Sequence, residues 1–276
     1  MNTLLKQPVY GVEAEVQYVA AAHRHLHCYA LTPPDGVAES NADFRPHTVE
    51  IRDARRRERP LSLDADGAAL ITQPSVLRQF GDADAVRRRY YPESAELIRA
   101  ATGAAQVVVF DHNVRLSGTA ARSDSYAPRR PVFHVHTDFT ARSARWRAET
   151  VLGRAIATDE RFAAINLWRP ITAPVRDCPL ALCEAGSVTP QDLVPVALLY
   201  PERTGEIYYV ARNPAHRWYY APEMRTDEAW LLKNFDSGGD PAARFTPHTA
   251  FVDPTVPRSV APRQSVEVRA IAVFAG

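Results

Sequence analysis

The sequence predicts a mainly β protein with flanking helices. Short runs of alternating or continuously apolar residues make up most of the C-terminal part, and helical periodicity is concentrated before them. The chain has 22 scattered prolines and only 12 glycines, which is typical of many short strands joined by structured loops. Together these patterns favour a double-stranded β-helix, that is, a jelly-roll, cupin-like barrel with added helices and strands.

The first hundred residues carry three strand signals and one helix signal. Residues 12–19 alternate between apolar and polar side chains, and 48–52 and 69–72 are further strand candidates between turn residues. From 82 to 101 apolar residues recur at helical spacing around a proline, and a Thr-Gly pair closes the segment. The apolar positions of this expected helix are Val86, Tyr90, Leu97 and Ile98.

The rest of the chain is expected to be mostly strands. Residues 106–110, 131–138 and 162–168 read as buried strands, and 143–156 has helical periodicity. One more helix is expected at 227–234. The remaining strand candidates are 193–200, 206–210, 218–220, 249–252 and 265–274.

Length and charge limit the classes of protein. A chain of 276 residues with 46% hydrophobic residues can bury one large core. We therefore expect one domain over 1–276, with 1–105 as an N-terminal embellishment and 106–276 as the barrel core. The 33 basic and 32 acidic residues nearly balance, which argues against nucleic acid or an anionic membrane as a partner and favours a small-molecule substrate.

The cysteines and the N-terminal segment predict a cytoplasmic protein. Cys28, Cys178 and Cys183 match no zinc-ribbon or redox spacing, and three thiols cannot all pair with one another. The first residues lack the apolar core of a secretory signal, and no stretch approaches the roughly 20 apolar residues that span a bilayer. Reduced thiols in the cytoplasm are the expected state.

A metal site is predicted from one short motif and one distant histidine. His136-Thr137-Asp138 places an imidazole and a carboxylate on one face of a strand, because side chains two residues apart in a strand point the same way. His248, at the entry to a later strand, is the expected third ligand. Two His and one carboxylate leave three positions open on Fe(II), the arrangement of non-haem Fe(II) oxygenases.

The start of the last strand predicts a co-substrate site. Arg263 and Ser265 follow the distant histidine, and a guanidinium with a neighbouring hydroxyl can hold the distal carboxylate of 2-oxoglutarate. H-x-D by itself is a weak pattern, but its order with a distant His and then R-x-S is specific.

At this point the chain resembles a known family, the non-haem iron oxidoreductases of secondary metabolism related to the cephamycin 7α-methoxylation component, gibberellin-type desaturases and fungal meroterpenoid oxygenases. The resemblance runs through nearly the whole chain. Its segments are Val49–Arg55, Tyr90–Glu93, Thr102–Ala104, Val108–His112 with Arg115, Val135–Thr140, Asn166–Pro170 with Pro179–Ala181, Trp218–Tyr220, Met224, Lys233, Phe235–Ser237, the His248 segment and Pro262–Arg269.

The resemblance implies oxidation of a small natural product with Fe(II), 2-oxoglutarate and O₂. Hydroxylation and desaturation are the common outcomes. Arg269 shares a strand face with Arg263 and is a second candidate for 2-oxoglutarate, as is Asn166. Members named as methoxylation components also act with a partner protein, so a partner oxygenase subunit or a homodimer stays open.

Aromatic and basic residues of the later strands are candidates for the substrate wall. Trp168, Arg169, Trp218 and Phe235 are the substrate candidates, although a Trp in a strand usually packs in the core.

Several other polar groups have plainer interpretations. His134 shares the strand face of the ligands and is interpreted as a supporting or core histidine. The alternating His23, His25 and His27 favour a solvated edge over a metal site. Asp111 beside His112 lacks a nucleophile motif and is interpreted as structural.

Two other functions stay open at this stage. One is a cupin-type metal dioxygenase or isomerase that needs no 2-oxoglutarate because its own substrate chelates the ion. The other is a non-catalytic partner subunit of an oxygenase, which the retained ligand set argues against, because the carboxylate would then lie among histidines without an ion.

Overall fold

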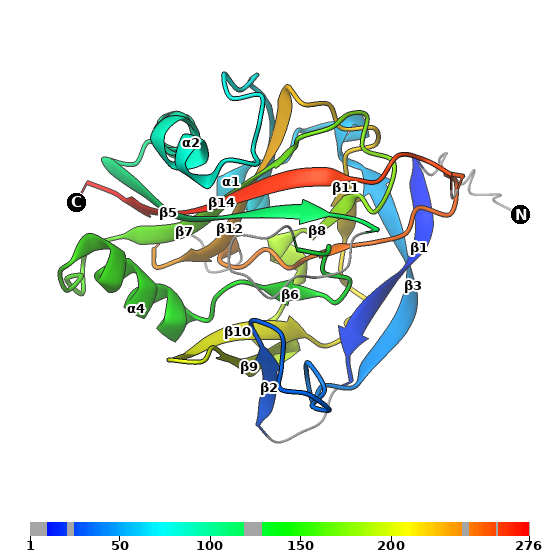
Figure 1. The fold of residues 1–276 in the computed structure, drawn as a ribbon, viewed down its shortest axis with the longest axis horizontal. Helices are drawn as coiled ribbons and strands as arrows, with labels where there is room; N and C mark the ends of the chain where they lie inside the picture. Colours follow the sequence, from blue (N-terminus) through cyan, green and yellow to red (C-terminus); the bar gives the residue numbers. More distant parts are fainter. Residues whose placement is uncertain (1–9, 21–24, 119–128, 239–242, 258, 276) are drawn as a thin grey trace, which may run out of the picture.

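The protein consists of two facing β-sheets with a few helices (Figure 1). The computed structural model describes residues 10–20, 25–118, 129–238, 243–257 and 259–275. The strand-rich architecture confirms the predicted jelly-roll class.

Strands that are far apart in sequence are neighbours in both sheets. The nine-stranded sheet has the order β1 (Gly11–Val19), β3 (Phe44–Asp53), β11 (Trp218–Tyr220), β8 (Leu180–Cys183), β13 (His248–Ala250), β6 (His136–Thr137), β10 (Thr204–Val210), β9 (Leu193–Leu199), β2 (Leu26–Tyr29). The five-stranded sheet has the order β4 (Ala68–Thr72), β12 (Glu228–Asp236), β7 (Phe162–Pro170), β14 (Gln264–Val273), β5 (Gln106–Leu116).

The helical segments are short. They are α1 (Leu63–Asp66), α2 (Ala83–Ala85), the π-helical turn η2 (Val86–Tyr90), α3 (Tyr91–Thr102), α4 (Ala141–Leu152) and the 3₁₀ turns η1 (Ala54–Arg56), η3 (Ala185–Ser187) and η4 (Pro190–Asp192).

One face of the five-stranded sheet is covered by helix, and the other faces the second sheet. Val266, Val268 and Ala270 of β14 pack in one cluster with Tyr90 and Ile98 of the helical segment. The alternate residues Ser265, Glu267 and Arg269 are polar and point the other way, toward the space between the sheets, and Ile271 and Val273 farther along the strand join the apolar cluster with α4. The period-two pattern of this strand therefore builds an apolar outer face and a polar interior.

The helix expected at 82–101 is confirmed, with one irregularity. Helical backbone runs from Ala83 to Thr102, Asp82 accepts hydrogen bonds at its start, and Gly103 with φ 69° ends it. The π-helical turn ends at Tyr90, two residues before Pro92. In a regular α-helix the proline ring would clash with the backbone carbonyl of the preceding turn.

The helix expected at 143–156 begins and ends earlier in the structure. Thr140 and Ser143 form a capping box that starts α4 at Ala141, and Gly153 with φ 67° ends it after Leu152.

The helix expected at 227–234 is wrong, because Glu228–Asp236 form strand β12. This strand lies between β4 and β7, and all nine of its residues are buried. A strand that is buried on both faces shows no alternation, so its apolar run could not be told from a helix by periodicity.

Smaller differences concern three other strands. Of the strand expected at 131–138 only His136–Thr137 is regular, with an isolated bridge between His134 and Gln17. Strands β2 and β8 were not predicted, since each has only four residues.

The first hundred residues extend both sheets at their edges. β1 and β3 lie at one end of the nine-stranded sheet, β2 at its other end, and β4 at the end of the five-stranded sheet. Cys28, Cys178 and Cys183 are all free thiols, as predicted. Within the described ranges, no helix has the length and apolar character to cross a membrane.

Candidate metal centre

Two neighbouring strands bring the two predicted histidines together. His136 on β6 lies directly opposite His248 on β13, and their ring centroids are 4.4 Å apart. Side chains of directly paired residues project from the same face of a sheet, so both imidazoles enter the interior.

Asp138 completes the group just after β6. Its backbone N–H donates to Asn234 Oδ1 on β12 of the opposite sheet, at 2.9 Å. One ligand atom from each of His136, Asp138 and His248 lies within 4.8 Å of the others, and this is the only such group of metal-competent residues within the part of the chain that the structure describes.

Backbone carbonyls set the tautomer of both imidazoles. His136 Nδ1 lies 2.9 Å from the carbonyl oxygen of His134, and His248 Nδ1 lies 3.1 Å from that of Thr246. A carbonyl can only accept, so each Nδ1 carries a hydrogen and each Nε2 keeps a free lone pair. Two free Nε2 atoms and one carboxylate are a donor set that fits a divalent metal ion.

Charges in the site favour the metal-binding protonation states. Burial, followed by the neighbouring His248 and His134, lowers the pKa of His136 well below its usual value, so the ring is neutral. Burial, the largest single effect, would raise the pKa of the Asp138 carboxyl, but Arg269, the two histidines and the Asn166 hydrogen bond together hold that pKa well below its usual range. Asp138 is therefore ionised at neutral pH.

Two residues of the five-stranded sheet hold the Asp138 carboxylate. Asn166 Nδ2 donates to Oδ2 at 2.5 Å, and Arg269 donates from Nε to Oδ2 at 3.3 Å and from Nη2 to Oδ1 at 3.2 Å. Asn166 and Arg269 are themselves direct neighbours in the pairing of β7 with β14. Two of the four predicted co-substrate candidates thus contact a predicted metal ligand.

Arg269 is surrounded by carboxylates. Besides Asp138 it binds Asp111 at 2.9 Å and Glu267 at 3.2 Å. Burial opposes its charge, but these acidic neighbours raise the pKa of Arg269 well above its usual value. Its guanidinium is therefore already engaged.

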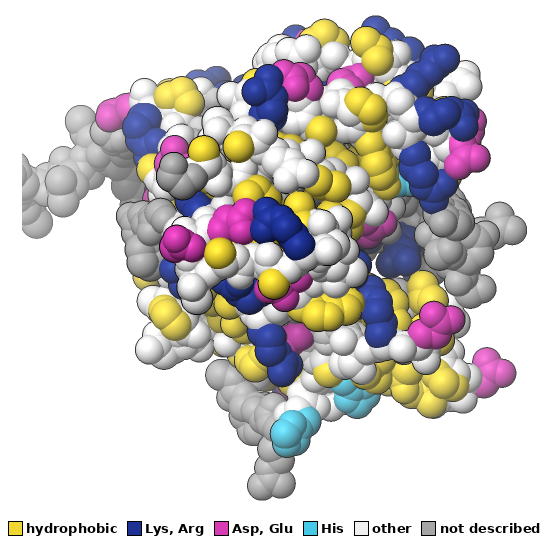
Figure 2. Space-filling view, turned by 90° about the vertical axis from the view of Figure 1, so that its left-hand side faces the viewer, with side chains coloured by type: hydrophobic (Ala, Val, Ile, Leu, Met, Phe, Trp, Pro, Cys, Tyr) yellow, Lys and Arg dark blue, Asp and Glu magenta, His cyan; other side chains and the backbone are white. Residues whose placement is uncertain are grey.

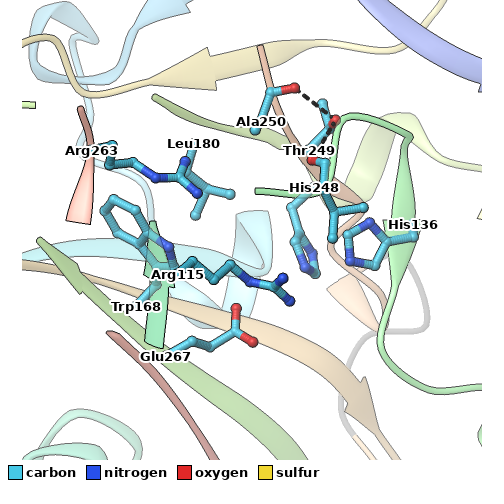
Figure 3. Close-up of a pocket in the computed structure, with 10 residues that line it drawn as sticks. Arg115, His136, Trp168, Leu180, His248, Thr249, Ala250, Arg263 and Glu267 are labelled. Carbon is cyan, nitrogen blue, oxygen red and sulfur yellow. Dashed lines mark hydrogen bonds between the residues drawn. The ribbon is translucent and has the colours of Figure 1, made fainter. Parts of the chain in front are cut away.

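A small, partly open cavity lies next to the two histidines (Figure 3). Figure 3 shows the Arg115 guanidinium pointing toward the imidazoles, Glu267 beside it, and Arg263 farther away near Trp168. Both arginines therefore line the same cavity.

Arg263 is buried with unmet hydrogen-bonding capacity. Its guanidinium carbon lies 5.5 Å from the Trp168 ring centroid, and Nη1 donates to the Cys178 carbonyl. Its Nε has no partner, nor has the buried hydroxyl of Ser265. Burial lowers the pKa of Arg263 to about 10. Buried polar atoms without partners are rare, and these two fit a site for a carboxylate ligand.

Sequence reasoning missed Arg115 and Glu267 as cavity residues. Glu267 continues the alternation of Arg263, Ser265 and Arg269, so the polar face of the last strand was a signal for it. Arg115 is opposite Ser265 in the pairing of β5 with β14, which no local pattern reveals.

Of the substrate candidates, only Trp168 lines the cavity. Arg169 points to the other face of β7, where it donates to the Tyr90 hydroxyl at 3.1 Å and to the Gln73 and Thr226 carbonyls. Trp218 donates from Nε1 to the Tyr18 hydroxyl at 2.9 Å in a separate cluster.

Phe235, the remaining candidate, packs under α4. It belongs to an apolar cluster with Phe162 and residues of that helix, and its ring centroid lies 5.4 Å from that of Phe162.

The other polar groups have structural contacts. His134 stacks on Phe44 with ring centroids 4.7 Å apart, and burial lowers its pKa to about 4. His112 bonds the Tyr91 hydroxyl at 2.8 Å, while Asp111 turns to Arg269, so the two form no dyad. His23 lies outside the described residues, and His25 is exposed.

Comparisons with known proteins agree with this site. A family model described as "Oxidoreductase/YMDC permease-like domain" matches residues 16–274. The chain is 32% identical over 257 residues to the Fe(II)/2-oxoglutarate-dependent dioxygenase nvfI of Aspergillus novofumigatus, with 90% of each chain covered. It is 34% identical to the alpha-ketoglutarate-dependent dioxygenase phiK of a fungal species (strain ATCC 74256), covering 96% of this chain and 99% of the relative.

Solved structures give the same result. The iron and alpha-ketoglutarate-dependent endoperoxidase NvfI is similar with a TM-score of 0.84 and 30% identity, over 96% of this chain and 98% of that chain. These likenesses favour the 2-oxoglutarate-dependent interpretation over a 2-oxoglutarate-independent cupin or a non-catalytic subunit. The chain belongs to the family of Fe(II)/2-oxoglutarate-dependent oxygenases, oxidoreductases that use Fe(II), 2-oxoglutarate and O₂.

Proposed function

We propose that His136, Asp138 and His248 hold Fe(II) in this enzyme. The convergence of two free Nε2 atoms and one ionised carboxylate within 4.8 Å carries the proposal. When bound, Fe(II) with 2-oxoglutarate and O₂ supplies the oxidising power for the reaction.

The cavity beside the histidines is the proposed place for 2-oxoglutarate. Arg263, with its partnerless Nε, and the Ser265 hydroxyl hold the distal carboxylate, and Arg115 adds a second positive charge to the same space. Glu267 offsets part of that charge, so the cavity walls retain a net positive charge that suits a dianion.

Asn166 and Arg269 have a different proposed role from the one expected. Their hydrogen bonds to Asp138 fix which way the carboxylate faces and keep it ionised. They act through the ligand and are positioning residues.

The proposed substrate is a small-molecule natural product of secondary metabolism, which the enzyme hydroxylates, desaturates or otherwise oxidises. Relatives named hydroxylase/desaturase support this range, including efuI of Hormonema carpetanum, which is 34% identical with 78% of this chain and 80% of the relative covered. Trp168 is the substrate-wall candidate that lies nearest to the site. A cytoplasmic location, and a homodimer or a partner oxygenase subunit, belong to the same proposal.

Anaerobic reconstitution tests the assignment. Fe(II) followed by 2-oxoglutarate should produce the visible metal-to-ligand charge-transfer band in the wild type and no band in His136→Ala. The His112→Ala variant, whose imidazole contacts Tyr91 away from the ligands, is the matched control and should keep the band. A folded wild type that gives no band would refute the proposal.

A further inference from the structure

Two arginines near the metal centre are held by aromatic rings. The arginine–aromatic cluster consists of Arg147, Arg203, Phe110, Trp146 and Tyr200. The Arg203 guanidinium carbon lies 3.7 Å from the Tyr200 ring centroid and 5.7 Å from that of Trp146. That of Arg147 lies 5.4 Å from the Phe110 centroid and 5.2 Å from that of Trp146. Three separate chain segments thus converge on this cluster.

Neither guanidinium has an acidic partner. Among the described residues, neither Arg147 nor Arg203 forms an ion pair or donates a side-chain hydrogen bond, and Arg147 Nε is buried without a partner. Elsewhere on α4, Arg142 pairs with Glu206 at 2.5 Å and Arg145 with Glu149 at 3.7 Å. Burial, followed by the like charge of Arg203, lowers the pKa of Arg147. Two neighbouring cations that form no ion pair favour an anionic group between them.

The cluster adjoins the metal centre on the side of Asp138. Arg147 lies 5.4 Å from the ring of Phe110, whose neighbour Asp111 pairs with Arg269 at 2.9 Å, and Arg269 binds Asp138 at 3.2 Å. Asp138 does not line the proposed 2-oxoglutarate cavity, which is formed around the histidines, Arg115 and Arg263. The cluster is therefore a separate group of cations.

The surface on this side of the molecule is hollowed. Figure 2 shows Lys and Arg side chains interspersed with hydrophobic ones around a hollow on the face where α4 and the end of β14 lie. Exposed Trp146 belongs to this side of α4, with 47% of its surface accessible. A single ligand could place an anionic group on the guanidiniums and a flat apolar group against the rings.

We propose that the arginine–aromatic cluster is a substrate subsite for a carboxylate carried on a flat conjugated ring. The inference rests on the proposed function, because the cluster would hold the substrate beside the iron. Guanidiniums bind carboxylates through charge-assisted, bidentate hydrogen bonds, and the aromatic rings fix the planes of the guanidiniums in advance.

Binding of two matched probes tests the subsite. The anaerobic protein with Fe(II) and saturating 2-oxoglutarate is titrated in a calorimeter with 2-naphthoate, and separately with the neutral 2-naphthamide. Saturating 2-oxoglutarate keeps the probe carboxylate away from the metal and from Arg263. We expect 2-naphthoate to bind at least about tenfold more tightly than the amide.

Substitutions locate the binding. Arg147→Gln and Arg203→Gln should each lower the affinity for 2-naphthoate by about tenfold. The affinity for 2-naphthamide should stay within about twofold of the wild-type value. Arg142→Gln, on the same helix but paired with Glu206, should bind both probes like the wild type. Should a Gln variant fail to fold by circular dichroism, Arg147→Lys and Arg203→Lys keep the charge and should retain most of the affinity.

Three results would overturn the subsite: no binding of 2-naphthoate at millimolar concentration, equal affinity for both probes, or an affinity unchanged in both Gln variants. The charge-transfer band is recorded on the same samples. Absence of the band in the wild type refutes the assignment of iron and 2-oxoglutarate. Binding of 2-naphthoate that depends on Arg147 and Arg203 tests the subsite and does not require the band.

Discussion

The two histidines and the aspartate of the metal centre are held in opposite ways. Each imidazole is fixed by a backbone carbonyl only two residues earlier in the chain, His134 for His136 and Thr246 for His248. The aspartate is fixed by side chains of the other sheet, 28, 96 and 131 residues away in sequence. Local contacts therefore set the positions of the two imidazoles, whereas the position of the Asp138 carboxylate depends on how the two sheets pack against each other.

Loss of a histidine should have the largest effect. His248→Ala removes one of the three proposed ligands, and we expect the affinity for Fe(II) to fall by more than about a hundredfold, because the metal-competent group found among the described residues has no fourth member. Anaerobic metal titration measures it. The same variant should fold like the wild type, because the hydrogen bond between His248 and the Thr246 carbonyl holds no other strand or helix in place. A metal affinity equal to that of the wild type would contradict the assignment of His248 as a ligand.

Arg269→Gln tests the carboxylate side. The change leaves Asp138, Asp111 and Glu267 close together without their common cation, and we expect the free energy of unfolding of the metal-free protein to fall by about 3 kcal/mol at pH 7. Urea unfolding measures the difference from the wild type.

The pH dependence of that difference has a definite sign. The folded-state pKa of Asp138 lies below its unfolded value of about 4, so the stability that the pair contributes is present above about pH 4 and is lost as pH falls through the folded pKa. The difference in the free energy of unfolding between wild type and Arg269→Gln should therefore stay constant from pH 7 to about 4 and narrow as pH falls further. A difference that also stays constant below about pH 4 would show that Arg269 acts through packing and not through charge.

Arg263→Gln should weaken the binding of 2-oxoglutarate and leave the affinity for Fe(II) unchanged. Losing a charge-assisted pair of roughly 1.5 to 3 kcal/mol corresponds to about a ten- to hundredfold rise in the Kd of 2-oxoglutarate. The charge-transfer titration measures this Kd, and Fe(II) affinity without 2-oxoglutarate serves as the internal control. If Arg115→Gln has the larger effect, the distal carboxylate belongs to Arg115.

Asn166→Ala should give the smallest change, about a tenfold loss of Fe(II) affinity, since Arg269 still holds Asp138 when one hydrogen bond is removed. Metal titration against Asn41→Ala, whose amide bonds the backbone near β2, provides the comparison. An affinity equal to that of the control would mean that the Asn166 contact does not orient the ligand.

Local patterns failed at β12, whose two faces are both buried, although they indicate a strand for the equally buried β7. The run at 227–234 lacks alternation because β12 lies inside its sheet, so it was assigned to a helix. Strand β14, with one apolar and one polar face, was predicted almost to its ends. The polar alternation from Arg263 to Arg269 also marked the interior of the site correctly, while leaving the role of each residue open.

The sequence by itself determined the jelly-roll class, and it predicted His136, Asp138 and His248 as the metal ligands. Spacing of two residues puts His136 and Asp138 on one face of a strand, and this geometry needs no knowledge of the rest of the fold. Only the tertiary structure decided that Asn166 and Arg269 bind Asp138, that Arg115 joins Arg263 in the cavity, and that Arg169, Trp218 and Phe235 lie elsewhere. The physical reason is that these contacts depend on which strands pair and in which register, and long-range pairing is not encoded in the periodicity of any one segment.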